Sequence, residues 1–285
     1  MTTKGLADVF KSKDFSKQYK LAERVTGLFA RPLVDLSGIA SYEQRPVVLD
    51  NACGTGIVGS TLHATLSDEV TQRWELTCGD VSEGMVEYTK KRAIEEKWRN
   101  VEAKFVDAQQ MGLASDHYSH VYTAFAFPMI PDTPGALKEC LRILKPGGTY
   151  ASANWKSTPQ ITIMIDSLSS LAAEVPLPNA EEFQSKLFQS WDSEAHVQAQ
   201  IEAAGFTDVK VTAVTRRAEV PIEEFVEISK ISVPAFFTRL WTQEQRDKYE
   251  ASLPDVMRQW LEEKFGADGV VPLEPTAIVA TARKP

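Results

Sequence analysis

The sequence predicts an α/β protein built on a doubly wound, seven-stranded and mostly parallel sheet with helical lid insertions. Three observations indicate this fold. Strand-like and helix-like segments alternate over residues 47–155, a glycine-rich turn follows the first buried strand, and an acid follows or ends each of the next two strands. Strands joined by helical crossovers run parallel, and such sheets bind ligands beyond the carboxyl ends of their strands. We therefore expect a ligand site at that edge.

The expected elements follow from apolar spacing and from the residues that stop each run. Helical spacing predicts two helices within residues 6–36. Short apolar runs predict strands at Val47–Asp50, Trp74–Cys78, Ala103–Val106, His120–Phe127, Thr149–Trp155, Val209–Thr215 and Thr276–Thr281. Helices are expected at Gly59–Leu66, Ser82–Lys97, Thr133–Leu144 and Ser193–Ala204, the last of which Gly205 stops.

Two segments interrupt this alternation. Residues 156–190 and 221–269 are helical in pattern and rich in large apolar side chains, so we expect them to form a helical substrate cap. The other expected units are an N-terminal helical lid at 1–46, a ligand-binding α/β core at 47–155, and segments 191–220 and 270–285 that complete the core sheet.

Composition limits the possible partners. The formal net charge of −8 and the lack of a dense Lys/Arg run argue against a nucleic-acid partner. No apolar run reaches membrane-spanning length, and the first residues lack a signal-peptide core. Cys53, Cys78 and Cys140 are widely spaced without a CxxC pair, which is typical of reduced thiols rather than a metal site. We expect a cytoplasmic monomer without a bound metal.

The glycine-rich turn is ambiguous about its ligand. Gly54-Thr55-Gly56-Ile57-Val58-Gly59 fits the dinucleotide pattern GxGxxG, which alone is weak. Asp80, at the end of the second strand, could accept hydrogen bonds from two ribose hydroxyls in a nicotinamide or an S-adenosylmethionine (SAM) enzyme. The alternative role for Asp80 and Asp107 is helix capping. A following Ser82-x-x-Met85 and the pair Asp107-Ala108 favour an adenosine bound next to a helix start, hence SAM.

Together, four motifs resemble those of class I SAM-dependent methyltransferases: Asp50-Asn51-Ala52-Cys53-Gly54-Thr55-Gly56, Asp80-Val81-Ser82-Glu83-Gly84-Met85, Asp107-Ala108 and Leu141-Arg142-Ile143-Leu144-Lys145-Pro146-Gly147-Gly148. The resemblance implies an antiparallel last strand and SAM over the ends of the first three strands. Ala52 stands where the family usually has glycine, and we expect its methyl group to fit at negative φ. The implied cofactor contacts are Tyr19, Asp50, Asn51, Ala52, Gly54, Thr55, Gly56, Asp80, Val81, Met85, Asp107, Ala108, Ala124 and Phe125.

A narrower resemblance covers nearly the whole chain. Segments such as Thr77–Met85, Tyr122–Phe127, Trp191–Glu194, Trp241–Arg246 and Val271–Glu274 are similar to the fungal gliotoxin bis-thiomethyltransferase and its relatives. Those enzymes methylate the two thiols of reduced epipolythiodioxopiperazine toxins. The resemblance implies a thiol S-methyltransferase acting on a small apolar dithiol, and the alternative is an O- or N-methyltransferase of another secondary metabolite.

The residues are compatible with a thiol acceptor. A thiol has a pKa near 8.5 and its thiolate is a strong nucleophile, so positioning suffices and no catalytic base is required. None of His63, His117, His120 and His196 falls where a base is expected. Apolar side chains expected to line the substrate site are Phe127, Met129, Trp155 and Phe236. Two other classes stay open, a nicotinamide oxidoreductase and a catalytically silent SAM-binding subunit.

Overall fold

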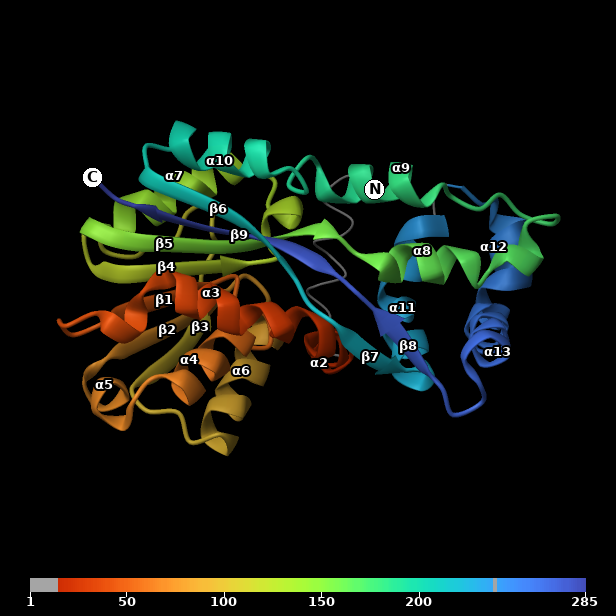
Figure 1. Cartoon of the computed structure of the whole chain (residues 1–285), viewed down its shortest axis with the longest axis horizontal. Helices are drawn as coiled ribbons and strands as arrows, with labels where there is room; N and C mark the ends of the chain where they lie inside the picture. Colours follow the sequence, from red (N-terminus) through yellow and green to blue (C-terminus); the bar gives the residue numbers. More distant parts are fainter. Residues whose placement is uncertain (1–14, 238–239) are drawn as a thin grey trace.

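The computed structural model describes the backbone of residues 15–237 and 240–285 and the side chains of residues 19–230 and 240–285. Its centre is a seven-stranded sheet in the order β3-β2-β1-β4-β5-β9-β6 (Figure 1). The strands are β1 (Val47–Asn51), β2 (Glu75–Asp80), β3 (Val101–Phe105), β4 (Tyr118–Ala124), β5 (Leu144–Ser157), β6 (Thr207–Thr215) and β9 (Thr276–Arg283). Strand β9 runs antiparallel to β5 and β6, and the other pairs are parallel. The predicted sheet is confirmed.

Helices cover both faces of this sheet (Figure 1). One face carries α3 (Ala30–Ser37), α4 (Ile57–Thr65) and α6 (Glu83–Glu95), and the other carries α7 (Thr133–Ile143) and α10 (Glu194–Ala203). The connections hold α5 (Asp68–Arg73), η2 (Ile39–Ser41) and η3 (Phe127–Met129). Successive side chains of a strand alternate between the two faces, so Val48 packs in the first core while Val47 and Leu49 pack in the second.

The cap is a separate layer beyond the carboxyl ends of the strands (Figure 1). It consists of α8 (Pro159–Asp166), η4 (Ser169–Leu171), α9 (Ala180–Phe188), α11 (Ile222–Phe237), α12 (Gln243–Tyr249), η5 (Glu250–Ser252) and α13 (Leu253–Phe265). A two-stranded antiparallel sheet of β7 (Ala218–Pro221) and β8 (Val270–Leu273) lies beside these helices. The cap has its own apolar core, in which Phe225, Leu253, Leu261 and Val271 are buried.

The small sheet corrects one sequence-based expectation. Residues 191–220 and 270–285 were expected only to complete the core sheet, yet 218–221 and 270–273 pair with each other. Their inward side chains Ala218, Val220, Val271 and Leu273 belong to the cap core. The reason is that the strands leading into and out of the cap continue past the core sheet, where the apolar surface nearest to them is that of the cap.

The N-terminal helix links the two layers. Helix α2 (Phe15–Thr26), followed by η1 (Gly27–Phe29), lies between the core and the cap (Figure 1). Val25 packs in the cap core, and Arg24 makes two hydrogen bonds of 2.6 and 2.8 Å to Glu224 of α11. The predicted N-terminal lid at 1–46 therefore contains a helix that contacts both layers, and its first 14 residues lie outside the described part.

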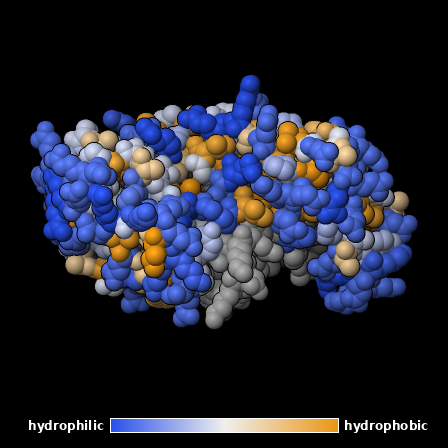
Figure 2. Space-filling model, turned by 90° about the horizontal axis from the view of Figure 1, so that it is seen from below, coloured by the Kyte–Doolittle hydropathy of each residue, from blue (hydrophilic) through white to orange (hydrophobic). Residues whose placement is uncertain are grey.

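The surface is mainly hydrophilic on the face seen from below, where hydrophobic atoms form small, separate patches (Figure 2). Among the large hydrophobic side chains that are exposed, Val81, Ile94 and Phe105 belong to the β2–α6–β3 edge of the core. No helix in the described part of the chain is both long and apolar enough to cross a membrane.

Candidate functional site

The turn after β1 forms a close-packed loop at the carboxyl edge of the sheet. Gly54 and Gly56 have positive φ angles of 56° and 79°, a region that side chains disfavour. A Cβ on Gly56 would lie 3.0 Å from Thr89 Cγ2 and 3.1 Å from the Trp98 ring. No side chain caps the start of α4 at Gly56. The loop therefore presents backbone N–H groups and the positive end of a helix toward the edge where a ligand is expected.

Ala52 departs from what the sequence predicted. We expected its methyl group to fit at negative φ, but its φ is +54°. The left-handed conformation brings Cβ close to the following carbonyl oxygen and costs about 1–2 kcal/mol for a residue other than glycine. The turn from β1 into the loop requires this conformation, which explains why glycine is usual at this position in the resembling family.

Asp80 is the acid that organises the loop. It is 8% exposed, and its two oxygens accept hydrogen bonds of 2.8 Å each, one from the N–H of Gly54 and one from that of Ser82. Burial raises the pKa of Asp80, and the N–H donors oppose that rise. Each carboxylate oxygen has about two lone-pair sites, so both oxygens can accept a further hydrogen bond. The N-cap of α6 is Ser82, whose side chain accepts from the N–H of Met85, so the capping role considered for Asp80 belongs to Ser82.

Asp50 holds the loop from the inside. Its Oδ2 accepts a 3.1 Å hydrogen bond from the N–H of Gly59 in α4, and the residue is 1% exposed. Burial raises the pKa of Asp50 from 3.8 to about 7, and the nearby charge of Asp80 adds to the rise. Its carboxyl group thus packs within the protein and does not present itself to a ligand.

Replacing Asp50 with asparagine should change how stability depends on pH. An acid with a raised pKa holds its proton more tightly when folded, so its contribution to stability is complete below its unfolded pKa and is lost as pH rises through about 7. Asparagine accepts from Gly59 but cannot ionise. At about pH 8, we expect the free energy of unfolding of Asp50→Asn to be higher than that of the natural chain by up to about 4 kcal/mol. The figure follows from the rise in the Asp50 pKa from 3.8 to about 7, because each pKa unit corresponds to about 1.4 kcal/mol. Urea unfolding at about pH 4, 6 and 8 should show this gap closing on acidification, and a pH-independent gap would contradict it.

Two other predicted contacts direct their side chains elsewhere. Asn51 is fully buried on the opposite, α7-covered face, where its Nδ2 donates to Thr123 Oγ1 at 3.2 Å. Thr55 is also buried, and its hydroxyl donates to Glu23 of α2. Strand alternation and the approach of α2 set these directions.

A buried ionic network fastens α2 to the loop. Arg92 of α6 donates from Nη1 to Glu23 Oε1 at 2.8 Å and to the carbonyl oxygen of Thr55 at 3.0 Å. Glu23 and Arg92 are 9% and 7% exposed. Thr89 Oγ1, one turn earlier in α6, donates to the carbonyl oxygen of Gly54 at 2.9 Å. Sequence reasoning missed this network, since no local motif relates an acid in one helix to a base in another.

Tyr19 of α2 lies over the same loop. A Cβ on Gly54 would be 3.4 Å from Tyr19 Cε1, so the ring packs directly against that glycine. Burial raises the pKa of Tyr19 to about 12, and the charges of Asp80 and Glu23 add to the rise. The phenol therefore stays protonated and remains a hydrogen-bond donor at the edge of the loop. Tyr19 thus lies beside the glycine loop, and its contact with the cofactor stays a prediction.

The residues predicted for the adenine end lie along the edges of β2 and β3. Val81 is 44% exposed directly after Asp80, whereas Met85 is buried in the first turn of α6. Asp107 Oδ1 accepts from the N–H of Gln109 at 2.9 Å and forms a turn after β3. Ala108 is buried next to it. Asp80 pairs in register with Phe105 of β3, so these residues share one edge of the sheet.

An aromatic group stands at the carboxyl ends of β4 and β5. The rings of Phe125 and Trp155 stack at a centroid distance of 4.2 Å, and Phe29 meets Trp155 edge-on at 5.4 Å. Phe125 directly follows Ala124, the last residue of β4, and has a φ of +56° while its N–H donates to Ala153 at 2.7 Å. Strained backbone of this kind is concentrated at functional sites. Phe29 was not predicted as a site residue.

The other residues predicted to line the substrate site are Phe127, Met129 and Phe236, and they lie in different surroundings. Phe127 is 1% exposed and stacks on Trp191 at 4.3 Å, inside the core that α7 and α10 cover. Trp191 covers one face of its ring, and the role of Phe127 as a substrate wall stays a prediction. Met129 is half-buried in η3. The Phe236 side chain lies outside the described residues.

None of the four histidines lies beside this aromatic group. His63 accepts from the N–H of Arg99, His117 lies 3.9 Å from Glu75, and His196 packs edge-on against Trp191. His120 is buried within β4, where desolvation lowers its pKa to about 3. Each histidine is held in a structural contact, so no imidazole base stands next to Phe125 and Trp155.

Comparison with known proteins identifies the class of protein to which this chain belongs. A family model described as a methyltransferase domain matches residues 48–148. Methyltransferase tpcH of Aspergillus fumigatus is 47% identical over 281 residues, which cover 98% of this chain and 100% of the relative. With the sheet order and the loop described above, the chain belongs to the class I SAM-dependent methyltransferases, so the predicted enzyme class is confirmed.

Within that family, the chain is similar along its whole length to a group of fungal methyltransferases. Acetylaranotin bis-thiomethyltransferase of Aspergillus terreus is 42% identical, with 100% of both chains covered. Methyltransferase ktnA of Aspergillus niger is 43% identical over 96% of both chains.

Solved structures support the fold. Phosphoethanolamine N-methyltransferase 2 of Haemonchus contortus, in complex with S-adenosyl-L-methionine, has a TM-score of 0.54 at 17% identity and covers 90% of this chain. A second structure of that protein, with S-adenosylhomocysteine, has a TM-score of 0.56 at 15% identity and covers 97%. This chain spans 52% and 60% of those longer chains, so the likeness concerns the fold alone.

Proposed function

We propose that this methyltransferase transfers methyl groups from SAM to the free thiols of a small dithiol natural product, a reduced epipolythiodioxopiperazine, and does so twice. The observation that carries the proposal is the 42% identity, over both full chains, with acetylaranotin bis-thiomethyltransferase. The aromatic group of Phe29, Phe125 and Trp155, which has no histidine beside it, supports the same acceptor.

The residues at the loop suit SAM. Asp80 keeps acceptor sites for the two ribose hydroxyls while it holds Gly54 and Ser82. The exposed Val81 and the turn at Asp107-Ala108 offer an apolar surface and a carboxylate for the adenine. At the other end, Tyr19 can donate to the methionine carboxylate. In this arrangement Asp50, Asn51, Ala52, Thr55 and Met85 act by shaping the loop.

Methyl transfer to a thiol does not require a catalytic base from the protein. The thiol loses its proton to solvent, the thiolate lone pair forms the new S–C bond, and the C–S⁺ bond to SAM breaks with its electrons left on the departing sulfur. SAM supplies an already activated methyl group, so catalysis consists of alignment and exclusion of water. Phe125 and Trp155 offer aromatic faces that attract a sulfonium and an apolar substrate. A phenol or an amine would gain more from a base.

Mass spectrometry tests the acceptor. Purified enzyme, SAM and a reduced epidithiodioxopiperazine should give the mono-methylated and then the bis-methylated thioether. The oxidised disulfide form serves as the control and should gain no methyl group. Methylation of phenols or amines alone would reject the thiol proposal and support an O- or N-methyltransferase. Binding of SAM with no turnover on any of these acceptors would reject both.

Replacing Trp155 with alanine should weaken substrate binding more than SAM binding. Loss of a buried aromatic contact costs about 1–3 kcal/mol, so KM for the dithiol should rise about 10- to 100-fold. Trp155→Phe keeps a ring against Phe125 and Phe29 and should restore most of the affinity. Steady-state kinetics and SAM calorimetry on both variants separate the two effects. An unchanged KM in Trp155→Ala would remove this residue from the substrate site.

A further inference from the structure

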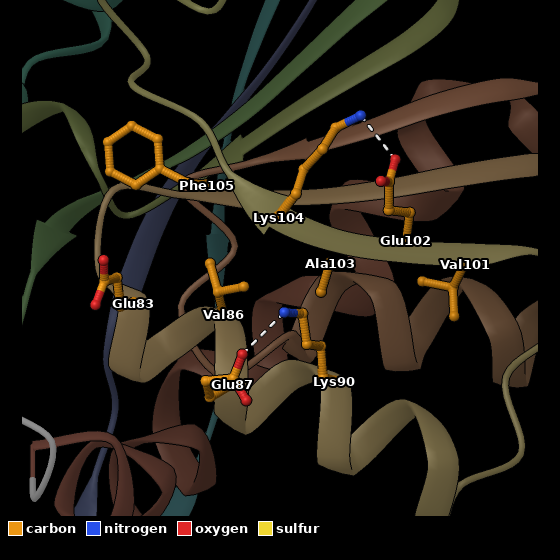
Figure 3. Close-up of a pocket in the computed structure, with 9 residues that line it drawn as sticks. All are labelled: Glu83, Val86, Glu87, Lys90, Val101, Glu102, Ala103, Lys104 and Phe105. Carbon is orange, nitrogen blue, oxygen red and sulfur yellow. Dashed lines mark hydrogen bonds and ion pairs between the residues drawn. The ribbon is translucent and has the colours of Figure 1, made fainter.

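Strand β3 forms one outer edge of the seven-stranded sheet in the described part of the chain. It pairs with β2 on one side, and no described strand covers its other side. Such an edge presents unpaired backbone N–H and C=O groups, which can pair with another strand. A groove of about 660 Å³ runs along it between β3 and α6 (Figure 3).

The sequence of β3 is self-complementary about its central residue. The strand reads Val101-Glu102-Ala103-Lys104-Phe105. The residues one position from Ala103 are an acid and a base, and the residues two positions away are both apolar. Glu102 and Lys104 lie on the same side of the strand and form a 2.7 Å ion pair (Figure 3). Their side chains are 64% and 36% exposed. An antiparallel copy of β3 would set Glu102 opposite Lys104 and Val101 opposite Phe105.

Helix α6 repeats this arrangement along the groove. Glu83, Glu87 and Lys90 line it, and Ile94 follows one turn later on the same helical face. Glu87 and Lys90 form a 2.8 Å ion pair that lies over Ala103 and its neighbours (Figure 3). In an antiparallel copy, Glu87 would face Lys90. A second copy related by the axis at Ala103 would carry its own Glu87–Lys90 pair along its own groove.

Apolar exposure is concentrated at this edge. Phe105 is 60% exposed and Ile94 is 77% exposed, high values for side chains of this size. In the two-fold arrangement, Phe105 would meet Val101 of the second copy at the end of the strand pair. An edge with matched charges and uncovered apolar residues fits a copy of itself, as isologous dimers require.

We propose that two copies of this chain pair through β3, antiparallel about a two-fold axis at Ala103, and join their sheets into one continuous sheet. This goes beyond the proposed activity and does not depend on it. It also replaces the monomer expected from the sequence with a dimer. The cross-strand pairs Glu102–Lys104 and Val101–Phe105 would each occur twice.

Charge reversal at the strand tests the proposal. Light scattering on the full chain at about 100 µM should give about twice the chain mass of 31.7 kDa. In the proposed dimer, residue 102 of each copy lies opposite residue 104 of the other, so each cross-strand pair occurs twice. Lys104→Glu would therefore place two acids opposite each other in both pairs, and Glu102→Lys would place two bases there. Each single variant should raise the dimer Kd about 10-fold or more, and the double variant Glu102→Lys/Lys104→Glu should restore it. The matched control is Lys186→Glu, which breaks the exposed Glu182–Lys186 pair of α9 and should leave the dimer unchanged.

Three outcomes would overturn the pairing. These are a natural chain that stays monomeric at that concentration, single variants that dimerise as well as the natural chain, or a double variant that does not recover. Circular dichroism confirms that each variant is folded. Because the readout is molecular mass, a failed methylation assay would not affect this conclusion.

Discussion

Replacing Arg92 with alanine is expected to lower the free energy of unfolding by about 3–5 kcal/mol. Arg92 and Glu23 are both buried, so removing the guanidinium takes the 2.8 Å partner from Glu23 Oε1 and leaves the carboxylate with the Thr55 hydroxyl and the more exposed Lys20. The same change removes the hydrogen bond to the carbonyl oxygen of Thr55 and loosens the glycine loop. SAM affinity should therefore fall together with stability. Urea unfolding and calorimetry measure the two effects.

Two comparisons make this prediction specific. Lys186→Ala breaks the Glu182 pair, whose side chains are 72% and 65% exposed, and should cost only about 0–1 kcal/mol. The double variant Glu23→Gln/Arg92→Met removes both charges and should recover part of the stability lost in Arg92→Ala, because the buried carboxylate that loses its Arg92 partner is then also neutral. A loss below about 1 kcal/mol in Arg92→Ala would show that the network does not hold α2 to the loop.

The features that sequence could predict are those encoded by neighbouring residues. Strand β1, the glycine turn and the start of α4 follow one another within a few residues, and each is indicated by local composition. Asp80 was predictable for the same reason, since the end of a strand fixes its position at the edge of the sheet. The antiparallel β9 was expected from the family resemblance and from an apolar run near the end of the chain.

Side-chain directions depended on contacts between distant residues. Glu23 and Arg92 are 69 positions apart, and nothing near either one indicates the other. Phe127 was expected to line the substrate site. Its ring instead stacks on Trp191, which lies 64 residues later in the chain (191 − 127). Ala52 was expected at negative φ because residue type alone favours it, whereas the turn imposes +54°. These outcomes are decided by packing, which single-sequence patterns do not record.

The last and largest expected effect concerns Asp80. Replacing it with alanine should raise the SAM dissociation constant by about 100-fold or more, since two hydrogen bonds to a charged group are worth about 1.5–3 kcal/mol each. The same change leaves the N–H groups of Gly54 and Ser82 without their 2.8 Å acceptor and should cost about 2 kcal/mol or more of stability. Calorimetry with SAM and urea unfolding report the two losses separately.

Asp80→Asn distinguishes the ribose contact from loop support. The amide oxygen can still accept from one of the two backbone N–H groups, so stability should recover in part. Its NH₂ group, however, cannot accept from the second ribose hydroxyl. We therefore expect Asp80→Asn to remain weak in SAM binding while it unfolds closer to the natural chain than Asp80→Ala does. If SAM affinity recovered in parallel with stability, Asp80 would act on the cofactor only by holding Gly54 and Ser82 in place, and the ribose contact would be removed from the proposed site.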